Sequence, residues 1–299
     1  MKKIIFDGVG TAIVTPFNNG EVDYNALEIL INKQLDANIS AIILLGTTGE
    51  PATLTLQERE KIILFAKNVI GNRAKLIIGC GSNNTQSAIN LYRQAESYGA
   101  DGALIVTPYY NKCTQDGLKA HYRAISDAGN LPIIVYNVPG RTGVNIMPET
   151  MAELCKIKNV VGLKEASGNI TQILDYFNLC GDKIAIYSGE DALNSFFLLL
   201  GAKGTISVAS NVFPKMCNKI IKYAKNKEYE KMLILQNKMQ QFIKALFLEV
   251  NPIPVKAGLF YLGLCKNELR LPLTSMTNNN YNKLKHEIDL LIGQENDSL

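Results

Sequence analysis

Residues 159–168 read Asn-Val-Val-Gly-Leu-Lys-Glu-Ala-Ser-Gly, a short apolar run that ends in a lysine. A run of Val and Leu of this length is typical of a buried strand in a parallel sheet. A lysine at its end, Lys164, has to leave water, and burial disfavours the charged form, so we expect its pKa to fall below the usual value of about 10.4. A neutral amine attacks carbonyl carbons. The alternative is that Lys164 reaches from the strand end into solvent, and this segment alone does not decide between the two.

Seven further apolar runs alternate with amphipathic stretches along the chain. With the first run, the eight expected strands are Gly10–Thr15, Ala41–Gly46, Leu76–Gly81, Gly102–Thr107, Pro132–Asn137, Val160–Lys164, Ile184–Ser188 and Gly204–Val208. The expected helices between and after them are Tyr24–Asn38, Leu56–Ile70, Thr85–Tyr98, Asp116–Ala128, Pro148–Lys156, Ile170–Cys180, Ala192–Leu200 and Pro214–Lys225.

Eight strand–helix units in about 225 residues predict an α/β fold of the (β/α)8, or TIM, barrel type. The competing fold is a doubly wound open sheet, which usually has fewer strands and a glycine-rich first turn. Neither G-x-G-x-x-G nor a P-loop follows the first expected strand, which favours the barrel.

The C-terminal part of the chain has a different pattern. Glu228–Val250, Pro252–Cys265 and Asn278–Ile292 predict three helices without intervening strands. We therefore expect a catalytic barrel over residues 1–227 and an all-α C-terminal domain over residues 228–299.

Composition narrows the function classes. Hydrophobic residues make up 47% of the 299 residues and charged residues 19%, which predicts a substantial core. The net charge of +4 and the absence of a dense basic stripe argue against nucleic acid. No signal peptide or membrane-spanning run is evident, and no pair of the six cysteines has the spacing of a zinc or redox motif. We expect a cytoplasmic enzyme without a membrane partner.

Polar residues gather where the expected strands end, which is where barrel enzymes place their catalytic groups. Residues 46–50 read GTTGE, whose hydroxyls and N–H groups can hold a carboxylate or, alternatively, cap the next helix. Residues 107–110 read TPYY, which supplies phenols or merely half-buried aromatic packing. Residues 136–143 read YNVPGRTG. There Tyr136 can shuttle protons and Arg141 suits a bidentate carboxylate, although packing and surface roles are the alternatives.

One lysine, several phenols, a threonine pair and an arginine are thus expected at one rim of the barrel. Gly189 and Glu190 follow the seventh strand, and Gly204–Ser207 form the eighth. Neither a histidine cluster nor a cofactor motif accompanies them. An amine, proton relays and anion-holding groups are what imine chemistry on a small anionic keto acid requires, which favours Lys164 as a nucleophile.

Four motifs in combination resemble the pyruvate-dependent class I aldolase superfamily, and within it most closely the dihydrodipicolinate synthase family. They are residues 46–50 (GTTGE), 106–110 (VTPYY), 136–143 (YNVPGRTG) and 162–165 (GLKE). The resemblance runs from the first strand to the NPIPVK segment at residues 251–256, so it covers nearly the whole chain.

The resemblance implies a lyase of the class I aldolase type that uses a Schiff base. Lys164 would attack the ketone of pyruvate, and the resulting enamine would add to aspartate-4-semialdehyde. The product would be 4-hydroxy-tetrahydrodipicolinate, in the first committed step of lysine and diaminopimelate biosynthesis. By the same resemblance Tyr136 is the proton relay, and Thr47 links it to Tyr110, which reaches in from a neighbouring subunit.

The remaining implied roles concern binding. Thr47 and Thr48 would hold the pyruvate carboxylate, Arg141 would bind the carboxylate of the semialdehyde, and the backbone carbonyls of Gly189 and Ile206 would line the pocket. The resemblance implies that no metal or organic cofactor is needed. It also implies a homotetramer built as a dimer of tight dimers.

Several related or unrelated activities stay open at this level. Sialic acid lyases share the lysine and tyrosine but lack an arginine at the position of Arg141, so this residue favours a carboxylate-bearing aldehyde. Aldolases of 2-keto-3-deoxy sugar acids and of the hydroxyproline pathway are harder to separate. A catalytically silent keto-acid sensor and a phosphate-binding barrel using Gly201–Gly204 are further alternatives.

The chain departs from the family at the positions that bind the feedback inhibitor lysine. Many bacterial members use a Ser-Ala pair, two histidines, an asparagine, a glutamate and a tyrosine there. The matching residues in this chain are Pro51, Ala52, Leu56, Arg59, Asn83, Ser87 and Tyr109. Ser87 replaces the glutamate, and losing such a charge-assisted partner costs about 1.5–3 kcal/mol. We expect lysine inhibition to be weak or absent.

Overall fold

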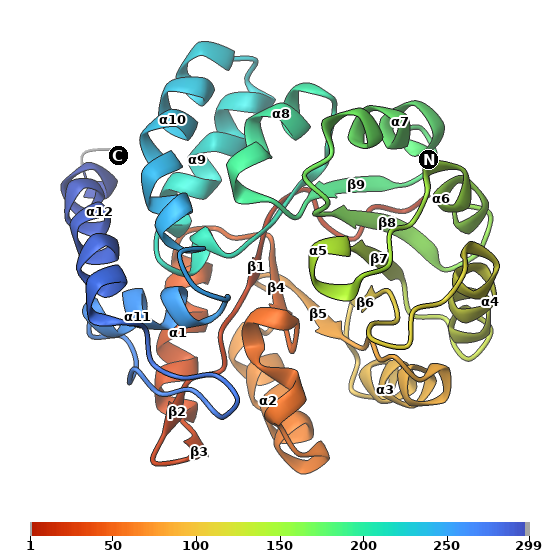
Figure 1. Ribbon diagram of the computed structural model, residues 1–299, viewed down its shortest axis with the longest axis horizontal. Coiled ribbons are helices and arrows are strands. Elements are labelled where there is room, and N and C mark those ends of the chain that lie inside the picture. The colour runs from red at the N-terminus through yellow and green to blue at the C-terminus, as the bar shows by residue number, and fades with distance from the viewer. Residues whose placement is uncertain (1, 297–299) are drawn as a thin grey trace. The chain divides into compact units, whose positions relative to one another are not determined.

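The computed structural model describes residues 2–296, and eight parallel strands close into a barrel in the order β1-β10-β9-β8-β7-β6-β5-β4 (Figure 1). This confirms the predicted (β/α)8 barrel. The barrel strands are nearly all buried, as expected when side chains and helices cover both faces of a parallel sheet. They are β1 (Gly8–Ala12), β4 (Ala41–Leu44), β5 (Lys75–Gly79), β6 (Gly102–Val106), β7 (Ile133–Asn137), β8 (Val160–Glu165), β9 (Ala185–Ser188) and β10 (Gly204–Ser207).

The expected strand boundaries differ from the observed ones at every strand, and the first two strands show why. β1 begins at Gly8, two residues before the expected start, because the Ser40 N–H donates to the Val9 carbonyl at 2.8 Å and so extends the ladder. Glycines contribute nothing to a hydrophobic pattern, which is why the pattern missed this start. β4 ends at Leu44 because Leu45 takes a left-handed conformation, with φ of 57°.

Helices follow the strands as expected, and three of them match the predicted limits residue for residue. The helices of the barrel are α1 (Tyr24–Asp36), α2 (Leu56–Ile70), α3 (Thr85–Ser97), α4 (Gln115–Ser126), α5 (Pro139–Thr142), α6 (Pro148–Leu154), α7 (Ile170–Cys180), α8 (Asn194–Leu199) and α9 (Pro214–Lys225). The C-terminal helices are α10 (Tyr229–Ala245), α11 (Ile253–Tyr261) and α12 (Asn278–Asn296). The helix expected at Ala192–Leu200 is divided, because Asp191–Leu193 form a 3-10 turn before α8.

Sequence reasoning also missed a small hairpin. β2 (Phe17–Asn18) pairs antiparallel with β3 (Glu21–Val22) through a turn at Asn19 and Gly20. Both turn residues have positive φ, 54° and 83°, as a type I′ turn requires. The Asn-Gly dipeptide is a strong hairpin signal, so this element was within reach of the sequence.

The described chain groups into two compact units. The first contains the residues up to Asp7 together with Lys75–Ile206, and so holds β5 to β9, most of β10, and α3 to α8. Within it, the N-terminal segment is held by Phe6. The Phe6 ring stacks on Tyr187 with centroids 4.4 Å apart, and the Tyr187 hydroxyl donates to the Phe6 carbonyl at 2.8 Å.

The second unit contains Gly8–Ala74 and the residues from Ser207 onward. It combines β1 to β4, α1 and α2 with α9 and the three C-terminal helices, and α10 packs against α9 and α12 (Figure 1). Phe213 and Phe242 form an edge-to-face pair at 4.9 Å that joins the start of α9 to α10.

Candidate functional site

Lys164 lies on β8 in register with Tyr136 on β7 and Tyr187 on β9. Only 5% of Lys164 is exposed, so it does not reach into solvent as the alternative interpretation required. Its Nζ lies 4.1 Å from the centroid of the Tyr136 ring, and Tyr136 is itself 7% exposed. The structure therefore brings the predicted nucleophile and the predicted proton relay into contact.

The electrostatics around Lys164 favour a reactive amine. Burial lowers the pKa of Lys164 to about 8, because the ammonium form loses its hydration. The carboxylates of Asp191 and Glu190 oppose this shift, and the Arg141 guanidinium reinforces it. Burial outweighs the two acids, so roughly a tenth of the amine is uncharged at pH 7. Such a fraction is sufficient for nucleophilic attack on a carbonyl group.

Gly189 makes room for the lysine. A β-carbon built at this glycine would lie 2.8 Å from Cε and 2.9 Å from Cγ of Lys164, and 2.9 Å from the Ala166 side chain. Such distances are shorter than real side-chain contacts. Any larger residue at position 189 would therefore displace the lysine.

Arg141 lies on the loop after β7, within the short helix α5. Pro139 begins this helix, and Gly143 ends it with φ of 70°. The Thr142 hydroxyl donates to the Val138 carbonyl at 3.2 Å and thereby braces the turn from inside. Arg141 itself is exposed, as a residue that meets an incoming anion has to be.

A buried polar network holds the loop that carries Arg141. Asn137 donates to the Glu165 carboxylate at 2.9 Å and accepts from the Ile146 N–H at 3.0 Å, so it ties the two ends of the loop together. The Tyr176 hydroxyl donates to the Ile146 carbonyl and accepts from Gln172 at 3.1 Å. Burial raises the pKa of Glu165, which the Ser167 N–H and Asn137 counteract.

Sequence reasoning missed this network, although Asn137 and Glu165 directly follow the two residues that it singled out. Two polar residues next to catalytic candidates at strand ends were the available signal. The partner Tyr176, from the middle of α7, gives no such signal.

In the second unit, the Thr47–Thr48 pair forms a 3-10 turn over Thr47–Gly49. Thr48 is buried, and its hydroxyl accepts from the Asn251 side-chain amide at 3.0 Å. The Thr15 hydroxyl donates to the Gly49 carbonyl at 2.7 Å. Thr47 is half-buried, and so is more accessible than its neighbour. The segment is therefore a fixed turn rather than the cap of α2, which Thr55 supplies.

The two tyrosines after β6 differ in exposure. Tyr109 is 40% exposed, and Tyr110 is 93% exposed with a positive φ of 69°. Ile206, on β10, is buried.

The residues at the positions that bind lysine in other family members lie on loops and near the starts of helices α2 and α3. Asn83 precedes α3, and its carbonyl accepts from the Asn111 amide at 2.9 Å. Ser87 is exposed in the first turn of α3. Leu56 is 62% exposed at the start of α2, whereas Arg59 on the same helix is buried. Pro51 and Ala52 form part of a second 3-10 turn.

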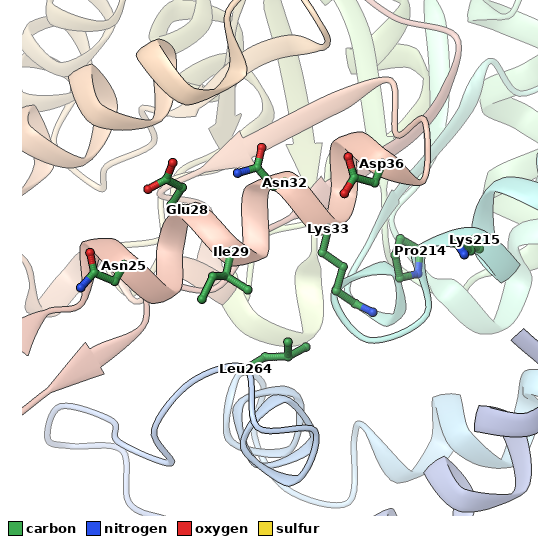
Figure 2. Close-up of a pocket in the computed structure, with 9 residues that line it drawn as sticks. All are labelled: Asn25, Glu28, Ile29, Asn32, Lys33, Asp36, Pro214, Lys215 and Leu264. Atoms are coloured by element: carbon green, nitrogen blue, oxygen red, sulfur yellow. The ribbon is translucent and has the colours of Figure 1, made fainter. Parts of the chain in front are cut away.

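A shallow groove of about 840 Å³ runs along α1 in the second unit, where Ile29 and Lys33 point toward Leu264 (Figure 2). Its walls consist mainly of exposed side chains and bring no buried polar group to the space. The groove is lined by Asn25, Glu28, Ile29, Asn32, Lys33, Asp36, Pro214, Lys215 and Leu264.

Among residues 2–296, no cluster of His, Cys, Asp and Glu could hold a metal ion, and no helix is long and apolar enough to span a membrane.

Comparison with known proteins agrees with the geometry. The model of the dihydrodipicolinate synthetase family matches residues 5–291. A 4-hydroxy-tetrahydrodipicolinate synthase from Alkaliphilus oremlandii is 50% identical over 95% of this chain and 98% of its own length. The crystal structure of dihydrodipicolinate synthase from Thermotoga maritima is 44% identical with a TM-score of 0.94, covering 98% of this chain and 99% of that one. A structure described as the first monomeric dihydrodipicolinate synthase variant is also 44% identical with a TM-score of 0.94, covering 96% and 97%.

Proposed function

This chain belongs to the dihydrodipicolinate synthetase family, and on that premise we propose that it condenses pyruvate with aspartate-4-semialdehyde to 4-hydroxy-tetrahydrodipicolinate. The reaction is the first committed step of lysine and diaminopimelate biosynthesis. The observation that carries the proposal is the buried Lys164 with its pKa lowered to about 8, in contact with the phenol of Tyr136.

The reaction begins at the Lys164 amine. It adds to the ketone carbon of pyruvate, and the carbinolamine loses water to give a protonated imine, which withdraws electrons from the pyruvate methyl group. Loss of a methyl proton gives an enamine, and the enamine carbon bonds to the aldehyde carbon of the second substrate. The amine of the adduct then displaces Lys164 as the ring closes, which returns the free enzyme.

Tyr136 is the proton relay in this proposal. The contact of its ring with the Lys164 Nζ supports that role, since it places the residue beside the nitrogen that exchanges protons. Thr47 and Tyr110 extend the relay, as in the family that the chain resembles.

Substrate carboxylates are held by two separate groups. The Thr47–Thr48 turn binds the pyruvate carboxylate through hydroxyl and backbone N–H donors. Arg141, exposed on a braced loop, binds the carboxylate of the semialdehyde through its planar guanidinium. The carbonyls of Gly189 and Ile206 complete the pocket. We propose that neither a metal nor an organic cofactor takes part.

The proposed assembly is a homotetramer, a dimer of tight dimers. The exposure of Tyr110 supports it, because a phenol that is 93% exposed in one chain is available to complete the relay of a second chain. We propose the cytoplasm as the compartment, which the six cysteines support because none of them forms a disulfide in the described part of the chain.

The decisive experiment combines trapping with turnover. Incubation with pyruvate and borohydride should add one reduced pyruvate at Lys164, located by mass spectrometry, and Lys164→Ala should abolish it. If the natural chain formed no adduct, the imine mechanism would be wrong. Turnover with aspartate-4-semialdehyde should exceed that with uncharged sugar aldehydes. The reverse preference would assign the chain to a sister aldolase activity.

Lysine is expected to be a poor inhibitor of this enzyme. Ser87 cannot supply the charge that would pair the α-amino group of lysine, and Leu56 offers no hydrogen bond. Loss of one charge-assisted partner corresponds to an affinity at least about tenfold lower. Initial rates measured across a lysine titration check this, and strong inhibition at sub-millimolar lysine would contradict it.

A further inference from the structure

The second unit contains an ion pair that the proposed reaction does not use. Lys256 Nζ, on α11, lies 2.6 Å from Glu50 Oε1, and the two side chains are 0% and 1% exposed. The Lys256 Nζ also lies 4.2 Å from the centroid of the Phe17 ring. Both residues belong to motifs that the sequence singled out, but those motifs are far apart along the chain and did not suggest a contact.

The backbone at Glu50 is unfavourable for a glutamate. Glu50 has φ of 52° and ψ of 44°, a left-handed conformation that costs a residue with a side chain roughly 1 kcal/mol or more. Glycine would adopt it more readily. The glutamate is therefore explained by what its carboxylate does rather than by the local backbone.

The Glu50 carboxylate connects two distant segments. One oxygen accepts a hydrogen bond from the Lys256 Nζ, and the other accepts from the backbone N–H of Arg270 at 3.2 Å. The Arg270 guanidinium in turn donates to the Thr53 carbonyl at 2.9 Å and to the Glu58 carboxylate at 2.9 Å. Glu50 and the residues that follow it are thus fastened to the C-terminal part of the chain.

This arrangement acts on the threonine turn. Glu50 immediately follows Gly49, and its N–H donates to the Thr47 carbonyl at 3.2 Å. On the other side, Asn251 donates to the Thr48 hydroxyl from the segment that leads into α11. A shift of α11 or of Glu50 would therefore move the hydroxyls and N–H groups of the Thr47–Thr48 turn.

A buried ion pair is a weak source of stability, because desolvation offsets most of the attraction between the charges. What the pair adds is directionality, since a charge-assisted hydrogen bond fixes its two partners more tightly than apolar packing does. We propose that Glu50 and Lys256 are positioning residues that set the Thr47–Thr48 turn for the carboxylate of the keto acid. This inference rests on the proposed function.

The test compares Glu50→Asp, Lys256→Met and the double variant Glu50→Gln/Lys256→Met. The readout is the pyruvate concentration that half-saturates borohydride trapping at Lys164, which does not depend on the aldehyde. We expect it to rise about tenfold or more in each variant, since small displacements of positioning groups have effects of this size. The KM for the aldehyde should change by less than about twofold, because Arg141 lies on another loop.

The double variant separates positioning from stability. It removes both buried charges, so its melting temperature should recover relative to Lys256→Met while the half-saturating pyruvate concentration stays raised. Recovery of both quantities would overturn the proposal, as would an unchanged concentration in Glu50→Asp, which keeps both charges and is expected to fold. The matched control is Lys75→Met, which breaks a surface ion pair of 2.8 Å in the other unit and should leave trapping unchanged.

This result is distinguishable from failure of the proposed function. If the natural chain forms no adduct with pyruvate, the imine mechanism fails and the positioning role fails with it. If the natural chain forms the adduct and the variants saturate at the same pyruvate concentration, only the positioning role is wrong.

Discussion

Lys164 illustrates how one residue can trade stability for reactivity. The burial that lowers its pKa to about 8 makes the amine available near neutral pH. The same burial costs stability, because protonation of Lys164 is less favourable in the folded chain than in the unfolded one. The contact with Tyr136 and the close approach of Gly189 keep the side chain in this position. Reactivity and instability therefore share one physical origin.

The rate of imine formation should follow the neutral fraction of Lys164. Below pH 8 this fraction falls about tenfold for each pH unit, so trapping at low pyruvate should slow by that factor from pH 7 to pH 6 and level off above pH 8. Timed borohydride quenches across this range check the profile. A rate that still rises steeply between pH 9 and pH 10 would mean that the lysine is not perturbed.

Lys164→Met should stabilise the protein at neutral pH while abolishing the adduct. The folded-state pKa of about 8 lies below the unfolded value of 10.5, so the unfolded chain binds more protons between these values and stability rises with pH there. Below pH 8 the full cost of about 3 kcal/mol applies. Urea unfolding should show a gain of up to this size at pH 7 and a smaller gain at pH 10. A less stable variant at pH 7 would contradict the argument.

At the scale of elements, β7, β8 and α7 cooperate to hold the Arg141 loop. Asn137, Glu165 and Tyr176 come from three different elements of the first unit and form one hydrogen-bonded set. The loop is therefore anchored at both ends by buried groups, while Arg141 at its tip stays exposed. A loop of this kind, held by a rigid scaffold and carrying an accessible binding residue, is a common arrangement in proteins.

Tyr176→Phe should loosen this loop without unfolding the barrel. The change removes the hydroxyl that satisfies the Ile146 carbonyl and Gln172, and an unsatisfied buried group costs about 1–3 kcal/mol. The free energy of unfolding should fall by that amount, and the KM for the aldehyde should rise more than the half-saturating pyruvate concentration. Equal changes in both constants would argue against a role specific to the loop.

Elements with strong local signals were predicted well. α2 begins at the residue after Thr55, where the side chains of Thr55 and Glu58 form a capping box, and its limits were predicted correctly. The end of β4 was missed because a single left-handed residue, Leu45, stops it, and hydrophobic patterns contain no information on φ. The Asn137 network was missed because its members come from elements far apart in the sequence, and only the places of Asn137 and Glu165 beside the catalytic candidates pointed to it.

At the scale of the whole molecule, the three C-terminal helices were predicted from periodicity, and we propose that the described residues from 228 onward form an α-helical domain that follows the barrel in the chain. The contacts within the second unit indicate how such a domain contributes. Phe242 packs on Phe213 at the start of α9, and Lys256 pairs with Glu50 on the loop after β4. Pairings between residues this distant in sequence are what periodicity cannot supply.

A chain that ends at Lys227 should therefore fail to fold cooperatively. Truncation would remove the partners of Glu50 and expose the buried Phe213 ring to water, and the exposure of one such ring alone costs about 1.5–3 kcal/mol. Circular dichroism during heating and gel filtration should show a broad transition and aggregation. A monodisperse truncated chain with a sharp transition would mean that the barrel is independent of these helices.

The missing side chain at Gly189 has a consequence for selectivity. The hydrocarbon stem of Lys164 occupies the space that a β-carbon at residue 189 would fill, so the position of the amine depends on the absence of that atom. The fit of a keto acid to the nucleophile is therefore set partly by a residue that has no side chain with which to touch it.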